Sequence, residues 1–321
     1  MKISILNFRD MSGVGYNLAE AINRLTSHEA VSIRLQNNFF NYPTHVELEG
    51  CEGSVANLVV DHQHKSLIAI QRAVYASDVI VIREFFELLR WLELDVDKIK
   101  RKQIIFTFGG WRFRNLEWRQ KTFDYFNGWN VKWMTTSADF IKDFDGTFVP
   151  CCVPMEEYRA KYDFRKRDPP LIIHTPSSMW AFQKSNEAFA YAINKLVGQC
   201  DFDADIHFDL PNEECLQKKA PASIFFDRLE YLYGVNSIEA ACFEAAVLTW
   251  TSHETLNALE RHAGMKCPFI IVNDREELHK ALNTLLSNPH YINELGKDCH
   301  RYAKQLHDGR YSAKQFLEMV E

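Results

Sequence analysis

The segment KISILNFRDMSGVGYNLAEAINRL (residues 2–25) decides the fold class. Apolar side chains dominate residues 2–7, which predicts a buried strand. A glycine loop follows at residues 11–15, and apolar side chains then recur at helical spacing from residue 16 to residue 25. A strand, a glycine loop and a helix in this order are typical of the start of a parallel α/β domain.

The same alternation continues along the first half of the chain. It predicts helices at 66–75 and 84–92, strands at 78–82 and 103–107, and short edge strands at 130–135 and 146–149. Because helices alternate with strands, we expect a parallel sheet with helices on both faces.

A break between residues 150 and 170 divides the chain. Pro154, the charged run 159–168 and the Pro169-Pro170 pair predict a connection between domains. The alternation then resumes, with strands expected at 171–174, 204–209, 222–226, 247–251 and 268–272, and helices at 185–197, 212–219, 237–246, 275–287 and 292–320. The sequence thus predicts an α/β protein of two tandem Rossmann-like domains, residues 1–155 and 171–305, with a linker at 156–170 and a last helix at 306–321.

The composition restricts the class of protein. A chain of 321 residues with 46% hydrophobic and 25% charged residues is typical of a folded protein of about two domains. Its 43 Asp and Glu outnumber its 37 Lys and Arg, and the net charge of -6 excludes the overall basic field of a protein that coats nucleic acid. Scattered cysteines, no signal-peptide pattern and no apolar run of about 20 residues lead us to expect a cytoplasmic protein without a transmembrane segment.

Three groups of residues at expected strand ends are candidates for binding an anionic ligand. Ser12, Gly13, Val14 and Gly15 form a small-residue loop before a helix, where backbone N-H groups point at a ligand, although a tight packing turn explains the same residues. In the second domain His174, Ser177, Ser178 and Lys184 suit a diphosphate, and the alternative is a capping turn with a solvated lysine. Glu239, just inside a helix that starts after Tyr233 and Gly234, suits ribose hydroxyls, and capping alone is the alternative.

A segment of the first domain interleaves aromatic and cationic side chains. Aromatic planes stack on sugars and bases, and the arginine fork grips phosphate, so this segment is a candidate acceptor site. The alternative is that the tryptophans belong to the core and the arginines are solvated. The candidate residues are Trp111, Arg112, Arg114, Trp118 and Arg119. His62 and His64 lack a third ligand at matching spacing, so we expect no metal site.

Taken together, these motifs resemble those of the retaining glycosyltransferases of the GT-B fold, the large family-four-like group. The loop at residues 12–15 is similar to the glycine loop that lies under the sugar phosphate of the donor. Glu239, five residues after Gly234, matches the second acid of the E-x7-E motif, which contacts the donor ribose in that family. The segment 274–290 and the helical tail resemble the end of the family, where the last helix crosses back to the first domain.

Two positions depart from the family pattern. Tyr231 stands where the first glutamate of E-x7-E belongs, and Phe108 replaces the histidine expected after a strand of the first domain, while Arg112 remains. Asp227, Tyr233-Gly234 and Glu239 are closer to a divergent branch that also lacks the first glutamate.

The resemblance implies a glycosyltransferase, a hexosyl- or pentosyltransferase, that takes a sugar from a nucleotide diphosphate-sugar without a cofactor or metal. It implies catalytic roles for Arg112 and Glu239, a donor site in the second domain and retention of anomeric configuration. The acceptor is a glycan or a lipid-linked sugar, with a hydroxylated base in DNA as the alternative. A homologue that binds nucleotide or glycan without turnover is the competing hypothesis. The sequence does not indicate the oligomeric state.

Overall fold

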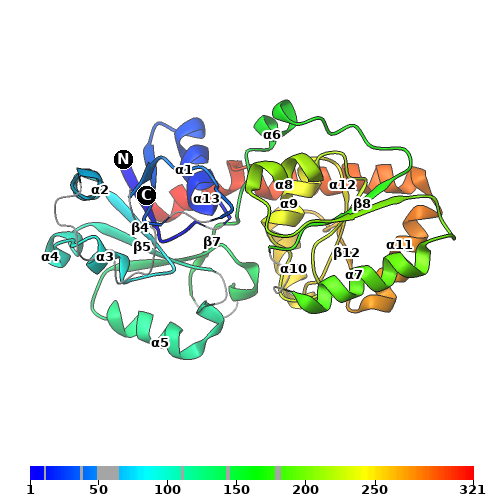
Figure 1. Cartoon of the computed structure of the whole chain (residues 1–321). Coiled ribbons are helices and arrows are strands. Elements are labelled where there is room, and N and C mark those ends of the chain that lie inside the picture. The colour runs from blue at the N-terminus through cyan, green and yellow to red at the C-terminus, as the bar shows by residue number, and fades with distance from the viewer. Residues whose placement is uncertain (11, 37–38, 49–64, 110–111, 142–144, 178–181) are drawn as a thin grey trace. The chain divides into compact units, whose positions relative to one another are not determined.

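The computed structural model describes residues 1–10, 12–36, 39–48, 65–109, 112–141, 145–177 and 182–321 (Figure 1). It divides into two compact units. The first contains Met1–Cys151 and Gly309–Glu321, and the second contains Cys152–Asp308.

Parallel strands form the sheet of the first unit. Its described strands are β1 (Lys2–Asn7), β2 (Glu29–Arg34), β3 (Val46–Glu47), β4 (Val79–Arg83), β5 (Gln103–Phe108), β6 (Val131–Thr135) and β7 (Thr147–Phe148). Their order is β3-β2-β1-β4-β5-β6-β7, and every pairing is parallel. The chain therefore adds β2 and β3 on one side of β1, and then adds β4 to β7 on the other side.

Helices flank this sheet. They are α1 (Val14–Leu25), α2 (Lys65–Ala76), α3 (Leu88–Trp91), α4 (Val96–Ile99), α5 (Leu116–Tyr125) and α13 (Arg310–Val320). One core cluster joins α2, α3 and α4 to alternate residues of β4 and β5, such as Ile80 and Phe106. The last helix, α13, packs beside α1, and the Oγ of Ser312 donates a 2.7 Å hydrogen bond to the carbonyl of Pro150.

The second unit repeats the architecture. Its described strands are β8 (Leu171–His174), β9 (Asp203–Ile206), β10 (Ile224–Phe226), β11 (Ala246–Thr249) and β12 (Ile270–Ile271), in the order β12-β11-β10-β8-β9 and all parallel. Its helices are α6 (Met155–Lys161), α7 (Gln183–Leu196), α8 (Asn212–Lys219), α9 (Val235–Cys242), α10 (His253–Ala263), α11 (Arg275–Leu286) and α12 (Pro289–His307). Helix α7 packs against α11, whereas α9 packs against α8 and α12 (Figure 1).

The α/β class and the two parallel sheets expected from the sequence are confirmed. Strands β2 and β3 and helix α10 were not predicted, and the helix expected at 84–92 is shorter, at α3. Residues of the expected linker form α6 and pack in the second unit, where Tyr158, Tyr162 and Phe164 contact a small core cluster. None of the helices in the described ranges has the length and apolar character to cross a membrane.

Candidate functional site

The carboxyl edge of the second sheet has the geometry of a ligand site. Strand β8 is followed by β9 on one side, and the chain then returns to β10 on the other side. In open parallel sheets, ligands bind outside the carboxyl ends of the strands at such a switch point. The loops at this point begin at Thr175, after β8, and at Asp227, after β10.

The helices that follow these two strands start without a side-chain cap. The cap residue of α7 is Phe182, in a left-handed conformation, and that of α9 is Gly234. By contrast, α10, α11 and α12 are capped by the side chains of Ser252, Asp274 and Asn288. The first N-H groups of a helix carry partial positive charge, so helix starts at a sheet edge favour an anion. At α9 the Asp227 carboxylate already accepts the N-H of the cap residue Gly234.

Arg228 brings a cation to both helix starts. Its guanidinium carbon lies 4.5 Å from the ring centroid of Phe182, and its Nη2 would lie 2.6 Å from a Cβ placed on Gly234. A side chain at position 234 would therefore displace the guanidinium. The Arg228 side chain is 18% exposed, so a ligand at the sheet edge can reach it. Arg228 was not among the residues predicted from the sequence. The signal that could have found it is an arginine two residues after the end of a strand at the switch point.

Asp227 fixes the loop that carries Arg228. Its carboxylate accepts hydrogen bonds from the Gly234 N-H at 2.9 Å and the Ser237 hydroxyl at 2.6 Å, and it pairs with Arg228 at 3.0 Å. Burial raises the pKa of Asp227, but Arg228 and these hydrogen bonds outweigh burial and hold the pKa below its ordinary value. The charged carboxylate thus orients the guanidinium and the start of α9.

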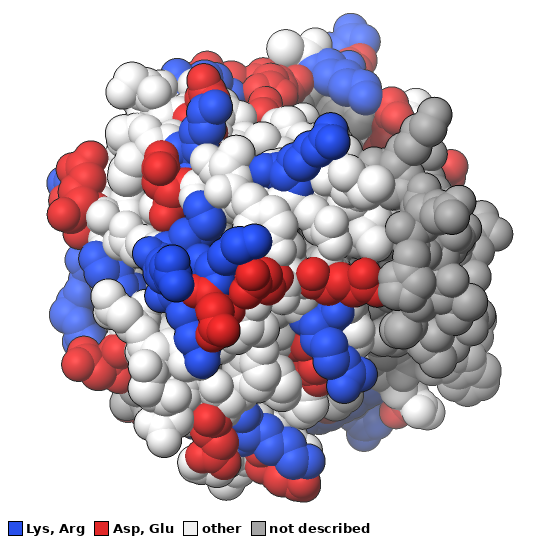
Figure 2. Space-filling view, turned by 90° about the vertical axis from the view of Figure 1, so that its left-hand side faces the viewer, with Lys and Arg blue, Asp and Glu red and all other residues white. Residues whose placement is uncertain are grey.

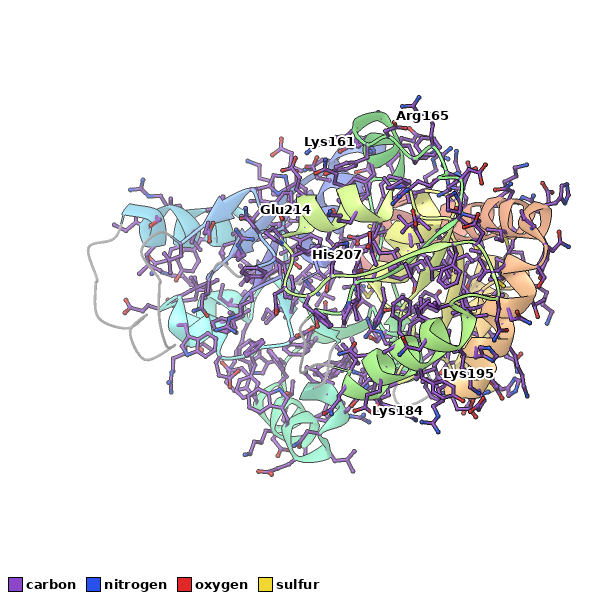
Figure 3. All side chains as sticks on the ribbon, turned by 45° about the vertical axis from the view of Figure 1, so that its right-hand side comes forward. Lys161, Arg165, Lys184, Lys195, His207 and Glu214 are labelled. Atoms are coloured by element: carbon purple, nitrogen blue, oxygen red, sulfur yellow. The ribbon has the colours of Figure 1, made fainter. Side chains whose placement is uncertain are left out.

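Polar groups surround the loop after β8. The hydroxyl of Thr175, and that of Thr251 after β11, are buried without a hydrogen-bond partner among the described residues. Ser177 is partly exposed and Lys184 is exposed in the first turn of α7 (Figure 3). The structure therefore brings Ser177, Lys184 and Gly234 to one sheet edge, while Ser178 lies outside the described residues.

His174 and Tyr233 lie inside the second unit. His174 is buried, and its ring nitrogens lie 2.9 Å from the Phe226 carbonyl and 3.0 Å from the Asn186 Oδ1. Burial lowers the pKa of His174, so its ring is neutral near pH 7. Tyr233 is 5% exposed, and its hydroxyl contacts His307. Both side chains are buried and make hydrogen-bond contacts inside the second unit. Direct contacts of His174 and Tyr233 with a nucleotide-sugar stay predictions.

Glu239 belongs to a buried polar network. Its Oε2 lies 2.6 Å from the Lys219 Nζ, its Oε1 accepts from Asn212 at 3.2 Å, and both charged side chains are fully buried. Lys219 also donates to Asn236, which donates in turn to the Thr175 carbonyl. The network ties α8 and α9 to the loop after β8. The Glu239 carboxylate is bonded to Lys219 and Asn212. The resemblance implies a ribose contact and a catalytic role for Glu239, and both stay predictions.

The two positions that depart from the family pattern, Tyr231 and Phe108, have different surroundings. Tyr231, which replaces the first glutamate, is 51% exposed, and its ring lies edge-on to Phe182 at 6.3 Å. Phe108, which replaces the histidine, is 1% exposed and packs on Phe113 and Trp133. Position 108 is therefore part of the core.

The glycine loop of the first unit has packing reasons for its composition. A Cβ on Gly13, whose φ is +63°, would lie 2.5 Å from the Tyr42 ring, and a Cβ on Gly15 would lie 2.2 Å from the Asn7 amide. The Asp10 carboxylate accepts the N-H groups of Gly15 and Tyr16. A carboxylate of the protein, that of Asp10, thus occupies the start of α1, which favours the interpretation of the loop as a packing turn. Ser12 is partly exposed and Val14 is buried. Contacts between this loop and a donor stay predictions.

The predicted acceptor residues have contacts within the first unit. Arg114 forms a 2.7 Å ion pair with Asp139, and Arg119 donates two hydrogen bonds to the Phe113 carbonyl. Trp118 stacks on Phe86 at 5.4 Å. These contacts favour the alternative of a packed tryptophan and structural arginines. Trp111 and the side chain of Arg112 lie outside what the structure describes, as do His62 and His64.

Comparison with known proteins identifies the fold. No family model matches this chain, and no curated protein does. HepE from Anabaena, solved in complex with UDP and glucose, matches with a TM-score of 0.69 and 11% identity over 100% of this chain and 99% of that one. A glycosyltransferase from Rickettsia africae matches with a TM-score of 0.64 and 14% identity over 99% and 97%. A UDP-N-acetylglucosamine 2-epimerase matches with a TM-score of 0.57 and 11% identity over 99% and 95%.

The chain therefore has the GT-B fold: two Rossmann-like domains with parallel sheets, and a C-terminal helix that belongs to the first of them. Both glycosyltransferases and epimerases are among its structural neighbours. At these identities the likeness shows the fold alone, and the choice of reaction has to rest on the site.

Proposed function

We propose that this protein is a glycosyltransferase that takes a sugar from a nucleotide diphosphate-sugar bound at the carboxyl edge of the second sheet. The observation that carries the proposal is the convergence of the Arg228 guanidinium with the starts of α7 and α9 at the switch point. A diphosphate satisfies this arrangement, because its oxygens accept from backbone N-H groups and from a cation together.

The same groups supply chemistry for sugar transfer. When the bond between the sugar and the diphosphate breaks, negative charge grows on the leaving phosphate oxygen. Arg228 and the N-H groups of α7 and α9 are fixed before the reaction, so they stabilise this charge without reorganising. Lys184, exposed in the first turn of α7, adds a second cation. This donor site needs no carboxylate cluster for a metal, and among the described residues no three acidic, histidine or cysteine side chains group to hold one.

The finer features of the proposal come from the resemblance. They are retention of anomeric configuration and an acceptor that is a glycan or a lipid-linked sugar. A cytoplasmic location is also part of the proposal, and it rests on the scattered cysteines and on the sequence having no signal-peptide pattern. On the face that Figure 2 draws, several Lys and Arg side chains gather left of the centre next to Asp and Glu, and elsewhere the two signs alternate. A DNA acceptor stays the alternative. Anomeric NMR of the transfer product would decide between retention and inversion.

Thermal melting with nucleotides tests the donor site. A ligand that binds only the folded state stabilises it by about 2.7 kcal/mol at a hundred times its dissociation constant. We expect at least one of the uridine, guanosine, adenosine and thymidine diphosphates to raise the melting temperature, and its sugar conjugate to release the nucleotide when an acceptor is present. No shift with any of the four, or with their sugar conjugates, would remove the donor site.

Lys184→Ala and Lys195→Ala form a matched pair for this test. Both lysines lie on α7, at its first turn and near its end (Figure 3). Lys195 pairs with Glu276 away from the switch point, at 3.4 Å. We expect Lys184→Ala to weaken diphosphate binding about tenfold, as loss of a charged contact does, without changing nucleoside binding. Equal losses in both variants would contradict the assignment of Lys184.

A further inference from the structure

The loop that carries Arg228 is anchored to the interior of the second unit through Tyr233. We call residues 227–234, between β10 and α9, the donor loop. Tyr231, near the middle of the loop, is exposed, whereas Tyr233 is buried, so its side chain points into the protein. The contacts of Tyr233 therefore act on the loop from inside.

Tyr233 ends in a buried polar cluster. Its hydroxyl lies 3.0 Å from the His307 Nε2 and 3.3 Å from the Tyr302 hydroxyl. Its ring packs edge-on against Phe269, at 5.1 Å between the ring centroids, and Phe269 packs in the same way on Tyr302. All four residues are at most 5% exposed. An outward movement of Tyr233 would take a hydrogen-bond partner from both His307 and Tyr302 inside the protein, so the cluster favours one position of Tyr233.

The donor loop is also held at both of its ends. The Leu229 N-H donates to the buried Ser185 Oγ at 2.9 Å, and the Gly234 N-H donates to the Asp227 Oδ2 at 2.9 Å. Between these two contacts, Tyr231 has a φ of 66°, a strained conformation for a residue with a Cβ. Such strain persists only where the surrounding structure determines the backbone. The loop is therefore held in one conformation by contacts with the interior of the second unit.

His307 lies at the end of helix α12, where the chain leaves the second unit. The chain enters this unit after Cys151 and returns to the first unit at Gly309. The His307 carbonyl accepts the Val153 N-H at 2.9 Å, so the backbone of His307 is bonded to the segment that enters the unit. This bond gives the His307 ring a fixed position from which to contact the donor loop.

We propose that His307 is a positioning residue of the donor site: it holds Tyr233, and through Tyr233 the loop that places the Arg228 guanidinium. The Arg228 Nη2 lies 2.6 Å from a Cβ built on Gly234, the residue after Tyr233. A displacement of Tyr233 therefore moves the backbone against which the guanidinium packs. This role rests on the proposed function, because it concerns the cation that binds the diphosphate of the same donor.

The affinity of the full-length protein for a nucleoside diphosphate tests this role. The probe is uridine, guanosine, adenosine or thymidine diphosphate, whichever the wild type binds. Tyr233→Phe and His307→Phe remove the contact but keep a ring, and each should weaken diphosphate binding about tenfold with nucleoside binding unchanged. His307→Gln keeps a group that donates or accepts, and should bind within about twofold of the wild type. In an Arg228→Gln background, His307→Phe should cause no further loss, because the guanidinium on which it acts is gone.

Hydrogen exchange of the ligand-free protein gives a second readout that needs no donor. The N-H groups of Leu229 and Gly234 should exchange about tenfold faster in Tyr233→Phe and in His307→Phe than in the wild type, because the loop opens more often. Leu295→Ala, which truncates a buried side chain elsewhere on α12, is the control. It should lower the melting temperature but leave these exchange rates and the diphosphate affinity unchanged.

Unchanged exchange with full diphosphate affinity in folded Tyr233→Phe and His307→Phe variants overturns the proposal. Equal acceleration of exchange in Leu295→Ala also overturns it, because His307 would then only stabilise the second unit. A further loss of affinity on adding His307→Phe to Arg228→Gln would show that His307 does not act through Arg228. If the wild type binds none of the four diphosphates while the exchange rates change as expected, the proposed function fails and the anchoring of the loop by His307 stands.

Discussion

The buried pair of Lys219 and Glu239 permits a quantitative prediction. The Nζ and Oε2 atoms lie 2.6 Å apart, and both side chains have zero exposure. Burial opposes the charge on Lys219, but Cys215 and Glu239 outweigh it and hold the pKa of Lys219 above its ordinary value. At an effective dielectric constant of about 20, two charges at this separation attract by about 6 kcal/mol, most of which offsets their desolvation.

Removing one partner should therefore cost far more than the pair contributes. Lys219→Met leaves the Glu239 carboxylate buried without the ammonium that balances its charge, and we expect a loss of about 3 to 5 kcal/mol in the free energy of unfolding. Glu239→Gln should cost a similar amount, because it removes the negative charge that balances the buried Lys219 ammonium. The double variant removes both charges and should cost clearly less than the sum.

Urea denaturation of the four proteins measures this coupling. A difference of more than about 2 kcal/mol between the double variant and the sum of the single variants would confirm a buried pair. Additive losses, with Glu239→Gln below about 1 kcal/mol, would show that Lys219 and Glu239 do not form a charged buried pair. The carboxylate would then be available to a ribose, as the resemblance implies, and Glu239→Gln should weaken uridine and UDP equally.

Two other predictions concern stability. Burial lowers the pKa of Lys166 from 10.5 to about 7, so between these two pH values the unfolded chain binds more protons than the folded protein. The free energy of unfolding should therefore rise with pH in this range, by up to about 1.4 kcal/mol per pH unit. Urea unfolding of Lys166→Met across the same pH range should lack this slope. Gly13→Ala should lose more stability in urea than Gly128→Ala, because both glycines have positive φ but only Gly13 has a neighbour, Tyr42, within 4 Å; equal losses would contradict the packing role of Tyr42.

Local patterns predicted most of the architecture. Strands such as β4 and β8 are short runs buried on both faces, and periodicity finds them directly. The sequence analysis missed β2, whose EAVSIR alternation is weaker and which owes its place to pairing with β1 along its whole length. Helix α3 is shorter than predicted because Glu84 to Glu87 turn at the end of β4.

The candidate site was less predictable because its contacts join distant parts of the sequence. Lys184 and Gly234 follow local signals for helix starts, and the sequence analysis located both. The Lys219 ammonium reaches Glu239 across 20 residues, and the position of Arg228 above Phe182 spans 46 residues, so no local spacing indicates either contact. Arg114 matched a phosphate-binding pattern, yet Asp139, 25 residues away, satisfies its charge.

Calorimetric titration of UDP and uridine into the wild type, Arg228→Lys and Arg228→Gln tests whether Arg228 binds the donor diphosphate. We expect UDP to bind the wild type and Arg228→Gln to weaken UDP binding about tenfold or more, with uridine binding unchanged. The UDP affinity of Arg228→Lys should lie between these two, because lysine keeps the charge without the planar fork. Circular dichroism melting should show that both variants fold. Full UDP affinity in a folded Arg228→Gln variant would contradict the placement of the donor diphosphate at the carboxyl edge of the second sheet.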